Sequence, residues 1–209
     1  MIRVLIADDH KIVREGIKQI LSRVPDIEVA GEAGTGQEAL EKIWANHYDV
    51  VILDISLPGR NGLEILKQIR TQMPKLPVLI LSMFPEEQYA IRVFRAGASG
   101  YLTKESDRDE IVQAVRWIAE GKKYVTPSLA EKLAAEFEPS STKALHEQLS
   151  DREYHILCLI AQGKSSNDIA EELALSVKTI STHRSRVLEK MSMKSNAELT
   201  HYAVQNKLV

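Results

Sequence analysis

Cysteine is almost absent from this sequence, and long apolar runs are absent altogether. The single cysteine among the 209 residues, Cys158, excludes a disulfide framework and any zinc site built from several cysteines. The six histidines show no spacing typical of a metal site. The apolar run near the N-terminus is too short for the core of a signal peptide, and no later run approaches the ~20 residues of a membrane-spanning helix. We therefore expect a cytoplasmic protein with no membrane partner.

The net charge is small, but one segment is strongly basic. Lysine and arginine together number 27 and aspartate and glutamate 29, which gives a formal net charge of −2. Residues 177–194 depart from this balance, with five basic side chains and a single acidic one, Glu189. Only this short segment is electrostatically suited to bind a polyanion.

Five short apolar runs divide the first part of the chain. They lie at residues 2–7, 27–33, 49–54, 77–82 and 99–104. Because the runs are rich in valine, isoleucine and leucine and do not alternate strictly, they are typical of strands buried on both faces. Amphipathic segments lie between them, and we place Ile12, Trp44 and Trp117 on the apolar faces of helices. The pattern predicts an α/β domain over residues 1–122, with a doubly wound, five-stranded parallel sheet.

The strand pattern ends with this domain. We predict a linker over residues 123–147 that contains one short helix, and a domain without strands over residues 148–209. Ser150 and Glu153 form a capping box at the first helix of that domain. Three further helices follow, so we expect an all-α domain of four helices with a short turn at residues 174–176.

Polar side chains stand at the ends of four predicted strands. Asp8 and Asp9 close the first strand, and Asp54 closes the third. Ser82 and Lys104 close the fourth and the fifth. Because ligands of open α/β sheets bind at the carboxyl ends of the strands, we expect these side chains at one site. Three carboxylates there repel one another and need a cation, for which Mg²⁺ is well suited.

A phosphoryl group would give each of these side chains a chemical role. Asp54 is the candidate nucleophile that forms an acyl phosphate. Lys104 and the metal would neutralise the phosphoryl oxygens, and Ser82 would donate a hydrogen bond to one of them. Taken singly, each side chain also has an ordinary interpretation as a helix cap, a loop residue or a surface charge. Their joint placement favours the functional interpretation.

Four segments of this domain resemble the receiver domains of bacterial two-component response regulators. They are DDH at 8–10, LDISLPGRNG at 53–62, LS at 81–82 and GASGYLTK at 97–104. The resemblance implies a flavodoxin-like sheet with strand order 2-1-3-4-5 and phosphoryl transfer from a sensor histidine kinase to Asp54. It implies that Asp9 and Asp54 bind Mg²⁺ directly and that Asp8 acts through water. The Ser56 carbonyl would be a further metal ligand.

The same resemblance suggests how the phosphoryl group is sensed. Tyr101 stands where such domains carry a switch aromatic, which turns inward as Ser82 moves towards the phosphoryl group. The alternative is a half-buried strand tyrosine without such a role. In physical terms, the added charge would bias an existing equilibrium between two states.

The basic segment coincides with the third predicted helix of the C-terminal domain. The face opposite its apolar side chains, which include Val177, carries Lys178, Ser181, Thr182, Ser185 and Arg186. Such a face suits the major groove of DNA, where cations engage phosphates and short polar side chains reach base edges. An ordinary helical bundle with a basic solvated face is the alternative.

Residues 149–191 resemble the LuxR/FixJ-type helix-turn-helix over their whole length. By this resemblance the side chains that contact DNA are Ser181, Thr182 and Ser185 on bases and Lys178, Thr179 and Arg186 on phosphates. The last helix resembles the element through which two such modules pair. The family often has an apolar residue at the position of Arg184, so Arg184 is either a further phosphate contact or a change in the base that is read.

Together these features predict a response regulator of the NarL/FixJ class, a transcription factor that forms a homodimer on phosphorylation or DNA binding. Its expected partners are a sensor histidine kinase, double-stranded DNA and RNA polymerase. We expect no enzymatic activity beyond its own phosphorylation and dephosphorylation. One alternative is a haloacid-dehalogenase-like phosphatase, although Ser56 stands where such enzymes have a second acid. Another is a DNA-binding protein whose first domain no longer accepts phosphate.

Overall fold

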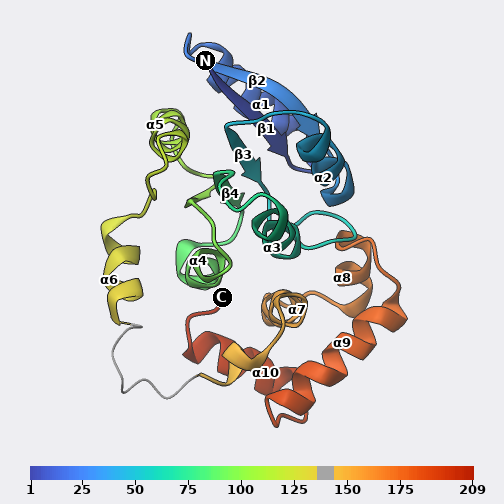
Figure 1. Cartoon of the computed structure of the whole chain (residues 1–209). Coiled ribbons are helices and arrows are strands. Elements are labelled where there is room, and N and C mark those ends of the chain that lie inside the picture. The colour runs from blue at the N-terminus through green and yellow to red at the C-terminus, as the bar shows by residue number, and fades with distance from the viewer. Residues whose placement is uncertain (136–143) are drawn as a thin grey trace. The chain divides into compact units, whose positions relative to one another are not determined.

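The computed structural model of the chain describes residues 1–135 and 144–209. The contacts divide the chain into two compact units, Met1–Leu133 and Ala134–Val209, and both are drawn in Figure 1. Each unit has its own buried apolar residues. Among the described residues, no helix is both long and apolar enough to cross a membrane.

A five-stranded parallel sheet forms the centre of the first unit. Its strands are β1 (Ile2–Ala7), β2 (Ile27–Ala33), β3 (Val50–Leu53), β4 (Val78–Ser82) and β5 (Gly100–Thr103). They lie in the order β2-β1-β3-β4-β5, and every neighbouring pair is parallel. β3 and β4 are buried along their whole length, which explains their continuous apolar sequences. The predicted fold class and strand order are confirmed.

Five helices follow these strands in turn. They are α1 (Lys11–Ser22), α2 (Gly36–Ala45), α3 (Gly62–Gln72), α4 (Glu86–Arg95) and α5 (Arg108–Ala119). α1 and α5 contact each other and share a core with one face of the sheet, to which Ile6, Ile52 and Leu81 belong. Alternate strand residues such as Val51 and Ile80 point to the other face, where α2, α3 and α4 lie. The sheet is therefore doubly wound, as predicted.

Of three predicted core residues, one lies at the surface and two are only about half-buried. Ile12 is 88% exposed, and Trp44 and Trp117 are 46% and 43% exposed. Ile12 precedes the buried Ile17 by five residues, which places it about 140° away round the helix. Trp117 donates its indole N–H to the Lys123 carbonyl (3.1 Å), which gives this half-exposed side chain a polar partner. The apolar faces of these three helices are therefore narrower than the sequence pattern predicted.

The chain continues to pack on the first unit after α5. The Tyr124 amide donates to the Ser99 carbonyl (2.8 Å), and Tyr124 forms a parallel bridge with Gly100 at the start of β5. Helix α6 (Pro127–Ala135) follows, with proline at its first position, where a helix needs no amide hydrogen. A helix thus lies within the predicted linker. Its predicted end at Pro139 lies outside the described residues.

In the described part of the second unit, four α-helices follow a short 3-10 helix at Leu145–Gln148. They are α7 (Asp151–Ala161), α8 (Ser166–Glu172), α9 (Val177–Lys190) and α10 (Asn196–Gln205). α7 contacts the other three, so it is the centre of this unit. Ser150 and Glu153 form the predicted capping box, and Ser165 and Asp168 form a second one before α8. The turn between α8 and α9 contains Ala174 with a φ of 50°.

Candidate functional site

The strand ends of the first unit bring two carboxylates and an ammonium group together. Asp8 follows β1, Asp54 follows β3, and Lys104 follows β5. The Lys104 Nζ lies 2.6 Å from a carboxylate oxygen of Asp8 and 2.7 Å from one of Asp54. Asp8 and Asp54 are each only 2% exposed. A buried cation therefore bridges two buried anions at the carboxyl end of the sheet.

The charges of this cluster depend on one another. Burial raises the pKa of the Asp54 carboxyl above its ordinary value; the Lys104 ammonium opposes this shift and the Asp8 carboxylate adds to it. Burial alone would lower the pKa of Lys104, but the carboxylates of Asp54 and Asp8 outweigh it and raise that pKa. One ammonium cannot neutralise two carboxylates, so the cluster keeps a net negative charge when both are ionised.

A third carboxylate and an imidazole lie beside this cluster. Asp8, Asp9, His10 and Asp54 each offer a ligand atom, and these atoms all lie within 4.8 Å of one another. The Asp9 side chain is 29% exposed, and its Oδ1 lies 2.8 Å from Nδ1 of His10. Carboxylate oxygens dominate the set, which is the donor chemistry that Mg²⁺ prefers. The residues present therefore fit such an ion. His10 was not predicted, although it directly follows the two acids.

The loop after Asp54 is fixed by backbone hydrogen bonds. The Ser56 amide donates to Oδ1 of Asp54 (3.2 Å), and the Gly62 amide donates to the Ile55 carbonyl (2.9 Å). A Cβ atom at position 62 would overlap the Asp54 carbonyl oxygen, so this close approach requires glycine. The loop thus orients one oxygen of the Asp54 carboxylate, while Lys104 holds the other.

Ser82 and Tyr101 meet at the backbone of Phe84. Ser82 is fully buried, and its hydroxyl oxygen accepts a hydrogen bond from the Phe84 amide (3.2 Å). Tyr101 is 1% exposed and donates its hydroxyl to the Phe84 carbonyl (2.6 Å). Burial raises the pKa of the Tyr101 hydroxyl, so it stays protonated and able to donate. Phe84 was missed by the sequence analysis because it acts through backbone atoms that nearly every residue has.

Helix α9 presents a polar face to solvent. Of the predicted DNA-contacting side chains, five are exposed and Thr179 is half-buried. The hydroxyls of Thr182 and Ser185 donate to backbone carbonyls one turn earlier (both 3.0 Å). Ile180 is fully buried on the opposite face. Val177 was expected on that buried face but is 44% exposed, because it lies at the very start of the helix.

The cations of α9 fall into two groups. The Lys190 Nζ lies 2.6 Å from a carboxylate oxygen of Glu153, and the Arg184 Nε donates to Oδ1 of Asn196 (2.6 Å). Lys178 and Arg186 are exposed and form no ion pair within the described part of the chain. Arg184 and Lys190 therefore hold neighbouring elements together, while the other two leave positive charge open to solvent.

Each of the two units matches a known protein family. Residues 4–116 match the response regulator receiver domain, and residues 147–203 match the luxR family of bacterial regulatory proteins. The chain belongs to the bacterial response regulators. The receiver match covers the carboxyl ends of all five strands and therefore every strand end that forms the acidic cluster, and the luxR match covers the polar face of α9.

Relatives of this response regulator match along its whole length. The response regulator UvrY of Escherichia coli strain K12 is 37% identical over 209 residues, 100% of this chain and 96% of UvrY. The oxygen regulatory protein NreC of Staphylococcus epidermidis is 40% identical over 215 residues, 99% of each chain. RcsB from Salmonella enterica serovar Typhimurium, solved bound to promoter rprA in the presence of phosphomimetic BeF3−, has a TM-score of 0.67 and 26% identity, covering 96% of this chain and 97% of RcsB. The chain is thus a transcriptional response regulator of the NarL/FixJ class, as predicted.

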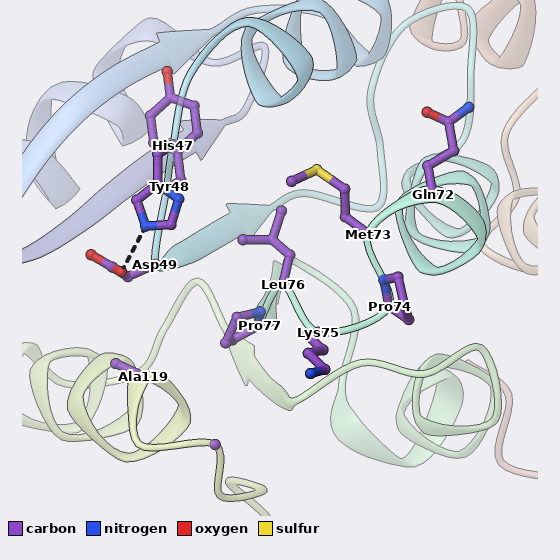
Figure 2. Close-up of a pocket in the computed structure, with 11 residues that line it drawn as sticks. His47, Tyr48, Asp49, Gln72, Met73, Pro74, Lys75, Leu76, Pro77 and Ala119 are labelled. Carbon is purple, nitrogen blue, oxygen red and sulfur yellow. Dashed lines mark ion pairs between the residues drawn. The ribbon is translucent and has the colours of Figure 1, made fainter.

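This response regulator also has a cavity at the amino ends of its strands, opposite the acidic cluster (Figure 2). The cavity has a volume of about 540 Å³ and is lined by the loops before β3 and β4 and by the end of α5. Met73 and Leu76 give it apolar walls, and the His47 imidazole at its rim lies 3.4 Å from a carboxylate oxygen of Asp49. Asp54 lies at the other end of β3, so this cavity is separate from the acidic cluster.

Proposed function

We propose that this response regulator accepts a phosphoryl group on Asp54 and that the modification controls DNA binding by α9. The strongest support is the position of Lys104, whose ammonium group lies within 2.7 Å of both Asp8 and Asp54. We assign the receiver to residues 1–122, the linker to 123–147 and the DNA-binding domain to 148–209. On this proposal the protein catalyses no reaction other than its own phosphorylation and dephosphorylation.

The phosphoryl donor is the phosphohistidine of a sensor histidine kinase. The Asp54 carboxylate attacks the phosphorus atom, a P–O bond forms, and the P–N bond to the histidine breaks. Attack requires the ionised carboxylate. Because burial raises the pKa of Asp54, the Lys104 ammonium is needed to keep that carboxylate ionised. The same ammonium then binds a phosphoryl oxygen.

Asp8, Asp9, Asp54 and the Ser56 carbonyl are the groups that we propose to hold Mg²⁺. The bound ion supplies charge neutralisation at the phosphoryl oxygens. The chain holds these ligands in place beforehand: the His10 amide donates to Oδ1 of Asp8 (2.8 Å), and Lys104 holds the other Asp8 oxygen. Asp9 is the most accessible of the three carboxylates, which suits a ligand that the ion meets first.

Ser82 and Tyr101 are the residues that sense the phosphoryl group in this proposal. The modification adds about −1.5 to −2 charge beside β4. The Ser82 hydroxyl then donates to a phosphoryl oxygen, which changes its hydrogen bond with the Phe84 amide. Tyr101 donates its hydroxyl to the Phe84 carbonyl and so stabilises the loop after β4 in one of two positions, before or after phosphorylation.

DNA binding is assigned to the exposed face of α9. Ser181, Thr182 and Ser185 contact bases, and Lys178, Thr179 and Arg186 contact phosphates. One module makes few phosphate contacts, so we propose a homodimer on paired half-sites. The 59% exposed Val204 on α10 supports pairing through that helix. Because the proposed partner is DNA, we propose that the protein acts in the cytoplasm. RNA polymerase is a further proposed partner, since the similar RcsB was solved bound to a promoter.

Phosphorylation by acetyl phosphate tests this function. The intact mass and the oligomeric state are measured for wild type and Asp54→Ala, with and without Mg²⁺. Asp109→Ala serves as the matched control, because Asp109 is an exposed acid in the first turn of α5. We expect wild type and the control to gain one phosphoryl group only with Mg²⁺ and to shift towards the dimer.

Two outcomes would contradict the proposal. A phosphoryl gain in Asp54→Ala equal to that of wild type would assign the acceptor to another residue. Equal affinity of the phosphorylated and unphosphorylated proteins for the same promoter DNA in a gel shift would mean that the modification does not control binding.

A further inference from the structure

Thr126 connects the linker helix to α4. Its hydroxyl donates to Oε1 of Glu86 (2.7 Å) and accepts a hydrogen bond from the Leu129 amide (3.2 Å). One side chain therefore caps the start of α6 and ties it to the first turn of α4. Leu129 is only 1% exposed, so the first turn of α6 is anchored rather than solvated.

Glu86 stands next to the residues that sense the phosphoryl group. It follows Phe84, on which Ser82 and Tyr101 converge, with only Pro85 in between. Proline fixes its φ, here at −58°, and therefore limits the freedom between Phe84 and the first turn of α4. A displacement of the Phe84 backbone is thus passed on to Glu86.

A second attachment holds the linker independently of α4. The Tyr124 amide donates to the Ser99 carbonyl, and Tyr124 bridges Gly100 at the start of β5. The linker is therefore fixed to β5 at Tyr124 and to α4 two residues later, at Thr126. A movement of the start of α4 away from β5 would stretch the Glu86–Thr126 hydrogen bond, because Tyr124 holds the linker to β5.

We propose that the Glu86–Thr126 hydrogen bond is a latch that opens when Asp54 is phosphorylated. The proposal rests on the proposed function. Ser82 turns towards the phosphoryl group, its contact with the Phe84 amide changes, and the segment from Phe84 to Glu86 moves. Thr126 then still caps α6 but no longer ties it to α4. The first turn of α6 loosens, and with it the chain that leads to the DNA-binding domain.

Hydrogen exchange of the full-length protein tests the latch, with Mg²⁺ and BeF3− as the phosphoryl mimic. In wild type we expect the amides in the first turn of α6 to exchange about fivefold faster with the mimic, the factor that corresponds to one net hydrogen bond. Glu86→Ala keeps the Thr126 cap but breaks the latch, so exchange should be fast with and without the mimic. Thr126→Val removes both hydrogen bonds and should exchange faster still.

Two variants separate the hydrogen bond from other effects of Glu86. Glu86→Gln keeps an acceptor oxygen without the charge and should respond as wild type does. Glu64→Ala removes an exposed acid from the first turn of α3 and should leave α6 unchanged. The latch proposal is wrong, and the proposed function stands, if the mimic changes exchange at residues 82–87 but not in α6, or if it still speeds exchange in α6 of Glu86→Ala. If the mimic does not change exchange at residues 82–87, both the latch and the proposed function are overturned.

Discussion

Charged side chains are held in opposite ways at the strand ends of the receiver and on the exposed face of α9. At the strand ends, Asp8 and Asp54 are buried and share one ammonium group. On α9, Lys178 and Arg186 are exposed and have no ion pair in the part of the chain that the structure describes. In the first arrangement the charges pair within the protein and leave a small net negative charge in a buried site, whereas the second leaves positive charge on the surface for a partner to neutralise.

This difference follows from the chemistry that each surface has to perform. A buried carboxylate must stay ionised to act as a nucleophile, and a neighbouring cation at short range strongly favours the ionised form. A DNA-binding face needs long-range attraction to phosphates, which exposed cations supply and salt screens. Substitutions should therefore have large, salt-independent effects at the strand ends and smaller, salt-dependent effects on α9.

The largest effect is expected for Lys104→Met. Removal of the ammonium leaves only the hydrogen bond from the Ser56 amide to oppose burial and Asp8, which raise the pKa of Asp54, and it removes a proposed ligand of the phosphoryl oxygens. We expect the rate of phosphorylation by acetyl phosphate to fall on the order of 10²-fold. The initial rate of mass gain at low and at high salt measures this.

The control for this substitution is Lys75→Met in the loop before β4, which should leave the rate unchanged. A fall of less than about threefold in Lys104→Met would mean that the buried ammonium group contributes little to transfer. A fall that disappears at high salt would mean that Lys104 acts like an exposed charge, and the comparison between the two surfaces would fail.

The second unit also has a buried ionisable group, but this one is kept neutral. His155 is fully buried, and burial, followed by the charges of Arg152 and Lys164, lowers its pKa to about 3. Since the unfolded chain has a histidine pKa of about 6.5, it binds more protons than the folded state between these values. Stability should therefore fall as the pH falls through this window, by about 1.4 kcal/mol at pH 5.5.

His155→Gln tests the pH dependence of the second unit. Whatever its stability at pH 7, the variant should lose most of the fall in stability that wild type shows between pH 7 and 5.5. His201→Gln, which removes an exposed histidine of α10, should keep it. Hydrogen exchange of α7 amides in urea measures the stability of this unit inside the full chain. Equal slopes in His155→Gln and wild type would assign the acid sensitivity to other groups.

Local and topological signals in the sequence predicted most of the architecture. The capping box at Ser150 and Glu153 lies within one turn, and strand ends meet because parallel strands share an edge. Contacts made by backbone atoms or by distant side chains left no such signal. Phe84 acts through its amide and carbonyl, and the hydrogen bond from Arg184 to Asn196 joins two helices. Ile12 shows a further limit, because an apolar residue near a helix start resembles a core position without being one.

A moderate effect is expected on α9 for Lys178→Ala and Arg186→Ala. Each should weaken binding to a random-sequence duplex about fivefold at low salt and reduce the slope of log K against log salt by about 1. Lys164→Ala is the matched control, because Lys164 already pairs with Glu172. A salt slope that does not change in either variant would remove these two residues from the set of phosphate contacts.

The smallest effect on DNA binding is expected for Arg184→Ala, although Arg184 lies on the same helix as Arg186. Its guanidinium donates to Oδ1 of Asn196 at the start of α10, so it is already engaged within the protein. The variant should change DNA affinity less than about twofold and leave the salt slope unchanged, while the loss of the hydrogen bond lowers the stability of the second unit by about 1 kcal/mol. Salt titrations of Arg184→Ala and Arg186→Ala side by side make the comparison. If the slope of log K against log salt falls by about 1 in Arg184→Ala, DNA displaces Asn196 and Arg184 contacts a phosphate. A hydrogen bond within the protein would then not distinguish the structural cations of this helix from those that bind DNA.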